Sequence, residues 1–295
     1  MKVFFIGNVN FSRSMLETLL GIEEVQVVGI ATKSKSNFNA DHTDLSDLAI
    51  QNDIPFKFVK DINAPNIIEW ISSVNPDVVY CMGWSSLIKT ELLNLAPNGV
   101  IGYHPAKLPQ NRGRHPLIWA LVLGLRETAS TFFKMNEGAD TGDIVSQVDV
   151  KIEEDFIAAD LYEALIQVSK EQIKDFTLGF VNGEVTFLKQ DHSKSNYWRK
   201  RGMLDGQINF SSNSKTIFNL VRGLSKPYVG AHLFFENQEV KIWSCEIGPV
   251  VDLNLEPGKV LEVSENRILI KTGDASIWID EHDFSILPQK NSYIL

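Results

Sequence analysis

The sequence has few cysteines: Cys81 and Cys245 are the two thiols in 295 residues. They lie far apart in apolar surroundings, which argues against a disulfide or a CxxC zinc site and favours two buried thiols. Long hydrophobic runs are also missing. The longest uncharged apolar stretch, Leu117 to Leu125, has nine residues, whereas a membrane span needs about 20. With no signal-peptide core at the amino terminus, we expect a soluble, cytoplasmic protein.

Positive charge is scarce as well. Lys and Arg number 28 against 37 Asp and Glu, which gives a formal net charge of −9. Such a surface repels phosphate polymers and anionic lipid, so we expect neither nucleic acid nor a membrane as the main partner. Two cofactor motifs are absent from the chain. Without GxGxxG after the first apolar run and without HExxH, the sequence argues against a dinucleotide cofactor and against a metal site.

The order of apolar patterns predicts an α/β protein with two domains. In the first half, short β-rich runs alternate with helical patterns, which is typical of crossover units in a Rossmann-like, mostly parallel sheet. Lys2 to Ile6 is the first expected strand, and Ser12 is placed to cap the helix that follows. Beyond position 230, closely spaced strands predict a smaller β-rich, OB-like barrel domain. The expected boundaries are a catalytic domain at 1–190, a linker at 191–213 and a C-terminal domain at 214–295.

Reactive residues are concentrated between positions 99 and 143. His104 directly follows a predicted strand, and such strand ends in open α/β sheets usually bind ligands. Asp140 follows the next strand along the chain, within Asp-Thr-Gly-Asp. If the two strand ends are neighbours, an imidazole and a carboxylate converge on one crevice.

Three ordered motifs surround these two residues. They are His-Pro-x-x-Leu-Pro from His104, Arg-Gly-x-x-Pro from Arg112, and Gly-x-Asp-Thr-Gly ending at Gly142, continued by residues 196–201 and 220–231. In this order they resemble the formyltransferase family, which includes methionyl-tRNA, glycinamide ribonucleotide and nucleotide-sugar N-formyltransferases. The residues of these motifs are most similar to those of the nucleotide-sugar enzymes. The resemblance covers most of the chain.

The resemblance implies transfer of a formyl group from 10-formyltetrahydrofolate to an amine, with His104 and Asp140 on the family's catalytic positions. The chemistry fits, because an imidazole can accept the amine proton or donate to the oxyanion, and a carboxylate can orient it. One position departs from the family pattern: Gly102 replaces an asparagine that polarises the formyl oxygen. Losing such a donor costs about 100-fold or more in rate. A backbone N–H at Gly102, a water, or a side chain such as that of Asn111 is expected to take over.

The resemblance also assigns binding residues. A flat pterin needs an apolar slot with backbone hydrogen bonds. The residues expected to form it are Met82, Gly83, Trp84, Leu87 and Ile88, closed by Asp140 and Asp143. For the acceptor, arginine suits a pyrophosphate and aromatic rings stack on a base or sugar. The candidates are Asn10, Ser12, Arg13, Lys35 with the loop up to Asp41, Arg112, Arg114, Tyr197, Trp198 and Arg199.

Charge and length discriminate between the acceptors. A β-rich second domain counts against glycinamide ribonucleotide enzymes, which resemble only the amino-terminal part. From Asp205 to Leu295 the chain has 8 Lys and Arg against 12 Asp and Glu, which makes a poor tRNA platform. We therefore expect a nucleotide-linked amino sugar, a 4-amino-4,6-dideoxy sugar of surface glycan biosynthesis, as substrate. Methionyl-tRNA formyltransferase, formyltetrahydrofolate hydrolase and a non-catalytic nucleotide-sugar-binding protein remain as alternatives, and a homodimer is compatible with the apolar second domain.

Overall fold

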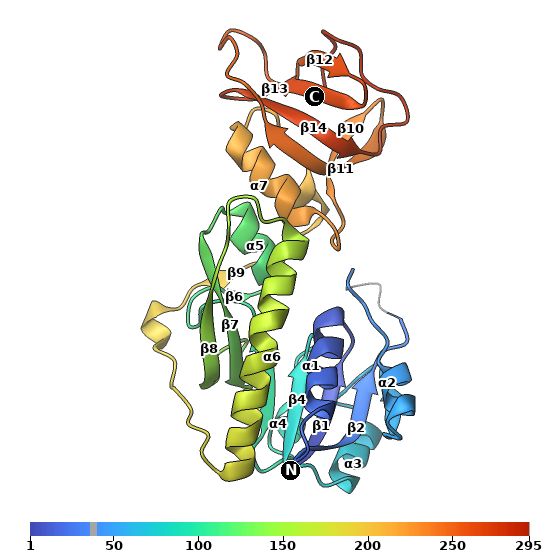
Figure 1. The fold of residues 1–295 in the computed structure, drawn as a ribbon, viewed down its shortest axis with the longest axis vertical. Helices are drawn as coiled ribbons and strands as arrows, with labels where there is room; N and C mark the ends of the chain where they lie inside the picture. Colours follow the sequence, from blue (N-terminus) through green and yellow to red (C-terminus); the bar gives the residue numbers. More distant parts are fainter. Residues whose placement is uncertain (36–39, 295) are drawn as a thin grey trace. The chain divides into compact units, whose positions relative to one another are not determined.

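The computed structural model describes residues 1–35 and 40–294, and the chain divides into two compact units (Figure 1). The first unit contains Met1–Pro116, Thr128–Lys151 and Glu163–Trp198. The second contains Leu117–Glu127, Ile152–Tyr162 and the chain from Arg199 onward. Residues 191–198, expected in the linker, thus belong to the first unit, and two segments before position 163 belong to the second.

A seven-stranded sheet forms the centre of the first unit, in the order β3-β2-β1-β4-β5-β7-β8. The strands are β1 (Lys2–Gly7), β2 (Gln26–Thr32), β3 (Phe56–Phe58), β4 (Val78–Met82), β5 (Val100–His104), β7 (Glu127–Lys134) and β8 (Ile144–Lys151). Neighbours from β3 to β5 pair in parallel, and β7 pairs antiparallel to β5. The expected mostly parallel sheet is confirmed. The edge strand β8 was not expected, because its polar residues hide the strand pattern.

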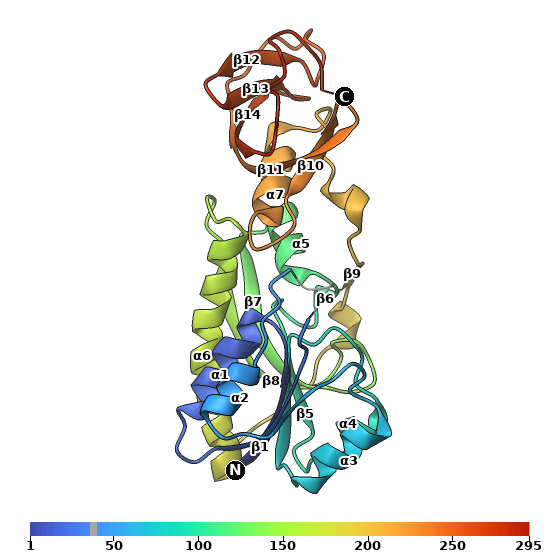
Figure 2. The same cartoon turned by 90° about the vertical axis from the view of Figure 1, so that its right-hand side faces the viewer.

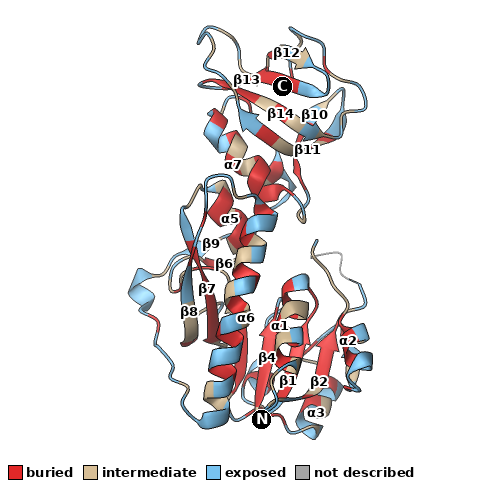
Figure 3. Cartoon of the chain, viewed as in Figure 1, coloured by how far each residue is buried: buried red, intermediate tan, exposed pale blue. Residues whose placement is uncertain are grey.

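Helices cover both faces of this sheet. They are α1 (Asn10–Leu20), α2 (Ser46–Gln51), α3 (Pro65–Ser73), α4 (Thr90–Leu93), α5 (Pro116–Val122) and α6 (Ala158–Asn182), of which α5 and α6 run from one unit into the other. Figure 2 shows α1 and α6 on one side of the sheet and α3 and α4 on the other. Because both faces are covered, the central strands are apolar throughout, and Figure 3 shows them buried. On the α6 side, Tyr80 of β4 bonds Thr177 at 2.8 Å.

The start of α1 corrects one expectation from the sequence. The helix begins at Asn10, and its N-cap is Val9 rather than Ser12. Ser12 is fully buried, donates its hydroxyl hydrogen to the Met82 carbonyl at 2.6 Å and accepts the Val9 N–H at 3.3 Å. The hydroxyl therefore ties the β1–α1 turn to the end of β4. The prediction failed because a local capping signal does not reveal this long-range carbonyl partner.

A five-stranded antiparallel sheet and one helix form most of the second unit. The strand order is β10-β11-β14-β13-β12. The elements are the short 3₁₀ helix η2 (Met203–Gly206), α7 (Ser214–Leu224), β10 (Ala231–Phe235), β11 (Gln238–Ile247), β12 (Val260–Ser264), β13 (Arg267–Lys271) and β14 (Ser276–His282). Ile217 and Val221 of α7 pack on this sheet, within one apolar cluster. The small β-rich second domain is confirmed.

Both cysteines are buried and free, as expected. Burial raises the pKa of the Cys81 thiol to about 12 and raises the pKa of Cys245 as well. Both thiols are therefore protonated and unreactive near neutral pH. None of the helices in the described part of the chain is long and apolar enough to cross a bilayer.

Candidate active site

His104 is the last residue of β5, and its side chain is buried, with 4% of the residue exposed. Its Nε2 lies 2.8 Å from the main-chain carbonyl oxygen of Asn111. Because a carbonyl only accepts, Nε2 carries the hydrogen, and in the neutral ring Nδ1 carries the lone pair. Nδ1 lies 3.6 Å from Oδ2 of Asp140, which is too long for a direct hydrogen bond. The Nδ1 lone pair of His104 and the carboxylate of Asp140 therefore face each other across this distance.

Asp140 lies in the loop between β7 and β8 and has a left-handed backbone, with φ of 56°. Aspartate tolerates this conformation better than most residues. Its Oδ2 accepts the Gly113 N–H at 2.8 Å, and its main-chain carbonyl accepts an N–H of the Gln190 amide at 2.9 Å. Groups from two other segments thus fix both the backbone and the carboxylate. The structure brings the two expected catalytic residues together.

Arg112 is buried, although it was expected to grip a phosphate. It lies in β6 (Arg112–Gly113), which pairs in parallel with β9 (Tyr197–Trp198), and 1% of it is exposed. The guanidinium donates to Gln190 Oε1 at 2.6 and 3.2 Å and to the Tyr197 hydroxyl at 3.0 Å, and its Nη2 lies 2.9 Å from Nδ1 of His192. Because these groups of the chain itself surround it, Arg112 is structural and has no face for a substrate.

Several other acceptor candidates are also occupied by internal contacts. Arg13 makes a double hydrogen bond to Asp47, at 2.9 and 2.8 Å, which holds the pKa of that carboxyl below its usual value. Asn10 accepts a hydrogen bond from Thr43. Arg199 belongs to the second unit, where its guanidinium pairs with Asp205 and holds the pKa of that carboxyl well below its usual range.

The remaining acceptor candidates are accessible. Lys35, Arg114 and Tyr197 are exposed, and Trp198 is half-buried. Positions 36–39 of the expected acceptor loop lie outside the described residues. The exposed side chains in the first unit are therefore the ones that an acceptor can reach.

The expected pterin loop follows β4 and mixes buried and exposed residues. Met82 and Ile88 are buried, whereas Leu87 is 67% exposed. Trp84 is half-buried, and Lys33 Nζ lies 4.4 Å from the centroid of its ring. Gly83 has φ of 65°, and a Cβ there would lie 2.2 Å from Val9. The loop presents an exposed leucine beside an indole that packs on the core with Lys33 over its ring.

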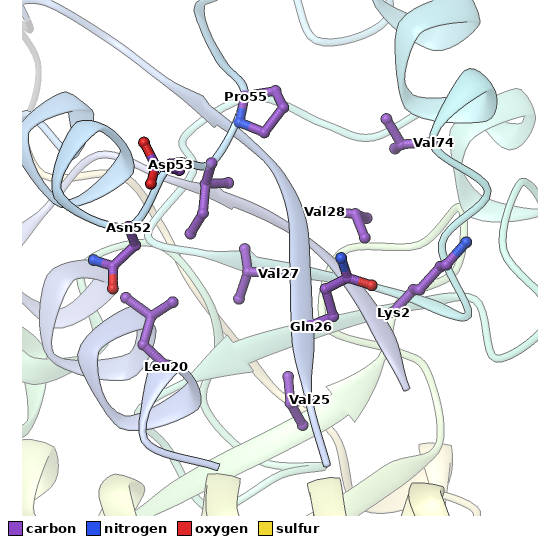
Figure 4. A pocket seen from close by; sticks show the side chains of 11 residues that line it. Lys2, Leu20, Val25, Gln26, Val27, Val28, Asn52, Asp53, Pro55 and Val74 are labelled. Carbon is purple, nitrogen blue, oxygen red and sulfur yellow. The ribbon is translucent and has the colours of Figure 1, made fainter. Parts of the chain in front are cut away.

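A cavity of about 360 Å³ lies between α4 and the loop that joins β7 to β8. Its lining residues are Thr90, Leu93, Asn94, Lys134, Met135, Asn136, Glu137, Gly142 and Asp143. It therefore includes Asp143, one of the expected folate residues. A second cavity, of about 530 Å³ (Figure 4), lies at the amino-terminal ends of β1 and β2, where Lys2 and Gln26 line it. None of the expected site residues lines that second cavity, so we assign it no part in the chemistry.

Gly102 lies two residues before His104 in β5, between Cys81 of β4 and Phe133 of β7. Its N–H therefore faces a neighbouring strand, which argues against an exposed backbone donor. A Cβ at this position would lie 2.8 Å from Cγ and 2.9 Å from Sδ of Met135. Met135 thus fills the space that a longer residue at 102 would need.

Gly102→Asn is expected to keep the fold and to raise the KM for the folate donor about 10-fold. The thioether of Met135 must move to admit the new side chain, and Met135 lines the 360 Å³ cavity. A tenfold change in KM corresponds to about 1.4 kcal/mol of binding free energy. Steady-state kinetics with varied donor measures this. Met135→Ala alone should raise the KM by a similar factor if the reason is correct, and an unchanged KM in Gly102→Asn would contradict it.

Three residues that the sequence did not single out contribute to the site: Met135, Gln190 and Asn196. Met135 is an ordinary apolar residue at the end of a strand, and Gln190 is one polar residue among many at the start of a polar segment. No local pattern marks either of them. Asn196 lies directly before Tyr197, in a motif that carried the resemblance, and that motif was the available signal.

Comparisons with known proteins identify the family. Residues 1–176 match the family model described as formyl transferase, and residues 203–287 match formyl transferase, C-terminal domain. The chain is 28% identical over 292 residues to a methionyl-tRNA formyltransferase from Alkaliphilus oremlandii (strain OhILAs), covering 97% of this chain and 92% of the relative.

Solved structures share the fold. One is WlaRD, a sugar 3N-formyl transferase with dTDP and 5-N-formyl-THF, at a TM-score of 0.70 and 20% identity over 95% of this chain and 96% of that one. Another is the N-formyltransferase from Helicobacter canadensis with folinic acid and dTDP-3-aminofucose. Its TM-score is 0.69, and it is 18% identical over 96% of this chain and 100% of that one. The first family model spans more than half of the chain and contains His104 and Asp140. This protein therefore belongs to the formyl transferase family.

Proposed function

We propose that this formyltransferase moves a formyl group from 10-formyltetrahydrofolate to the amine of a nucleotide-linked amino sugar. The observation that carries the proposal is the buried His104 with its Nδ1 lone pair turned towards Asp140, at the carboxyl end of β5. An amine has two N–H groups to donate, and Nδ1 and the Asp140 carboxylate are two acceptors 3.6 Å apart.

The two side chains then divide the chemistry. His104 Nδ1 takes the proton that the amine loses as its nitrogen bonds the formyl carbon. Asp140 orients the amine and stabilises the imidazolium that forms. His104 passes the same proton to the departing nitrogen of the donor as the old carbon–nitrogen bond breaks. The products are a formamide and tetrahydrofolate, and no other reactant is needed.

Asn111 is the donor that we assign to the formyl oxygen. Its main chain lies directly beside His104, and its half-buried side-chain amide is bonded to no other described residue. The Arg112 and Gln190 donors nearby are already bound. Preorganised donors of this kind stabilise an oxyanion where it develops.

The folate fits the loop after β4 and the cavity beside α4. Leu93 and Met135 give that cavity apolar walls, and Asp143 and Lys134 give it polar ones. Its 360 Å³ lies within the range of about 300–1,000 Å³ for small-molecule sites. The donor supplies the formyl group, and this pocket would hold its pterin.

Charge in the second unit favours a small acceptor over tRNA. Half of its eight cations after position 204 are engaged within the unit itself: Arg222, Lys241, Arg267 and Lys271. Arg267, for instance, bonds Asp280 at 2.6 Å and Glu246 at 2.9 Å. Lys241 and Arg267 are paired with carboxylates, which cancels most of their contribution to a field that attracts a polyanion, and Arg222 and Lys271 are buried away from the surface. A nucleotide sugar with two phosphates needs only a few local cations, such as Arg114 and Lys35.

Methionyl-tRNA is the second candidate acceptor. The observation in its favour is the full-length similarity to methionyl-tRNA formyltransferases, at 25–28% identity. That similarity extends over both units, so an activity assay must distinguish methionyl-tRNA from a nucleotide sugar as the acceptor.

The deciding experiment is a screen of UDP-, dTDP- and GDP-linked amino sugars with 10-formyltetrahydrofolate, read by the mass increase of one formyl group. We expect one sugar class to be formylated, and the dTDP-linked 4-amino-4,6-dideoxy sugars are the first to test. Formylation of methionyl-tRNA alone would support the second candidate. Release of formate without an amine would indicate a hydrolase, and binding without turnover a non-catalytic protein; either result contradicts the proposal.

A further inference from the structure

We propose that Gln190 and Asn196 are positioning residues, which hold His104 in the Nε2–H tautomer and hold Asp140 in place. Both lie in the segment 190–198, which follows α6 and includes the short 3₁₀ helix η1 (His192–Lys194). This segment packs within the first unit. The effect on turnover rests on the proposed function, but the effect on the tautomer does not.

Asn196 acts on His104 through Asn111. Oδ1 of Asn196 accepts the Asn111 N–H at 2.5 Å. Asn111 has a left-handed backbone, with φ of 61°, a conformation that asparagine tolerates. In this conformation its carbonyl oxygen meets Nε2 of His104 at 2.8 Å. The next residues along each segment, Arg112 and Tyr197, are partners in the β6–β9 pair, so Asn111 and Asn196 lie directly before that pair.

The tautomer of His104 is set by two competing acceptors. The Asn111 carbonyl favours a hydrogen on Nε2, whereas the Asp140 carboxylate favours a hydrogen on Nδ1. If the carbonyl moves away, the carboxylate prevails, since an ionised acceptor makes the stronger hydrogen bond. The lone pair then moves to Nε2, away from Asp140, and the base no longer faces the amine. Asn196 therefore decides which nitrogen is basic.

Gln190 acts on Asp140 directly. It is buried, and its amide donates to the carbonyl oxygens of Asp140 at 2.9 Å and Gly142 at 2.6 Å. Its Oε1 accepts from Arg112, which precedes Gly113, the donor to the Asp140 carboxylate. One side chain thus links the Asp140 loop to β6.

The first test compares Asn196→Leu with Asn196→Asp. Leucine has the same size and no acceptor, so we expect kcat to fall about fivefold, the value of one hydrogen bond, with the acceptor KM unchanged. Aspartate keeps an acceptor oxygen and should restore kcat. ¹⁵N NMR of the imidazoles, assigned with His104→Gln, should find Nε2–H in the wild type and in Asn196→Asp, and a shift towards Nδ1–H in Asn196→Leu.

The second test is Gln190→Glu. The glutamate keeps an acceptor for the buried Arg112, so the fold should persist, but it loses both N–H donors to the Asp140 loop. We expect kcat to fall about tenfold or more, with the His104 tautomer unchanged, because Asn196 is intact. Ser193→Ala is the matched control and should keep wild-type kinetics, because among the described residues Ser193, in the same segment, bonds Asp191.

The proposal fails if wild-type His104 carries its hydrogen on Nδ1, or if Asn196→Leu leaves the tautomer unchanged. It also fails for Gln190 if Gln190→Glu turns over like the wild type. A wild type that formylates no amine would overturn the proposed function alone, because the NMR measurement needs no substrate.

Discussion

His104→Gln is expected to lower kcat for formyl transfer by about 10²–10⁴-fold, the usual contribution of a positioned general base. The glutamine amide can still donate to the Asn111 carbonyl, which His104 now meets at 2.8 Å, so the local structure is retained while the basic nitrogen is lost. Asp140→Asn should lower kcat by a similar factor, because the charge that stabilises an imidazolium is gone. The amide oxygen can still accept the Gly113 N–H, which the carboxylate accepts at 2.8 Å, so the local structure is retained. Steady-state kinetics at saturating donor and acceptor measures both.

Thermal unfolding of both variants separates chemistry from folding, and each should melt close to the wild type. Asp149→Asn is the matched control, since Asp149 is exposed and pairs with Lys107 at 2.7 Å, and its loss should leave kcat unchanged. Near wild-type turnover in His104→Gln or in Asp140→Asn would remove the residue concerned from the mechanism.

Gly113→Ala is expected to lower the free energy of unfolding by about 3 kcal/mol, in the upper range for a single substitution, and to reduce kcat about 100-fold. Gly113 has φ of 107°, and an added Cβ would lie 2.2 Å from the main-chain oxygen of Trp198. The main chain cannot move aside as the end of a flexible side chain can, so β6 and β9 must separate. The Gly113 N–H then leaves Asp140, and the carboxylate loses its support. Urea unfolding and steady-state kinetics measure the two effects.

Gly183→Ala is the matched control. Gly183 also has a positive φ, of 72°, but no atom lies within 4 Å of an added Cβ. Its cost is then only that of a left-handed residue, about 1–2 kcal/mol, with no change in kcat. If Gly113→Ala destabilises the protein no more than Gly183→Ala, the close approach of β6 to Trp198 is not a constraint.

Much of the fold was predictable because it depends on local patterns. The apolar run within Lys2 to Ile6 predicts the first strand, and β1 forms there. The edge strand β8 and the pair β6–β9 were missed. Their residues are polar or few, and they are strands because of the neighbours they pair with, which no window of sequence contains.

The candidate site was predictable only in part, for the same reason. Motif order placed His104 and Asp140 together, and they meet at 3.6 Å. The same reasoning predicted that Arg112 binds a phosphate, yet Arg112 is buried and donates to Gln190 and Tyr197. An arginine in a basic motif looks the same whether it faces solvent or the interior. What distinguishes the two cases is the return of residues 190–198 to the first unit.

The residue order alone was enough to identify the formyl transferase family and the two-domain α/β organisation, and it proposed His104 and Asp140 as the reacting pair. The scarcity of positive charge and of cysteine also excluded a disulfide framework and argued against nucleic acid. The contacts that hold His104 and Asp140 appeared only in the folded chain. They depend on hydrogen bonds between residues 85 and 50 positions apart, Asn196 to Asn111 and Gln190 to Asp140. Such contacts exist only once the chain has folded.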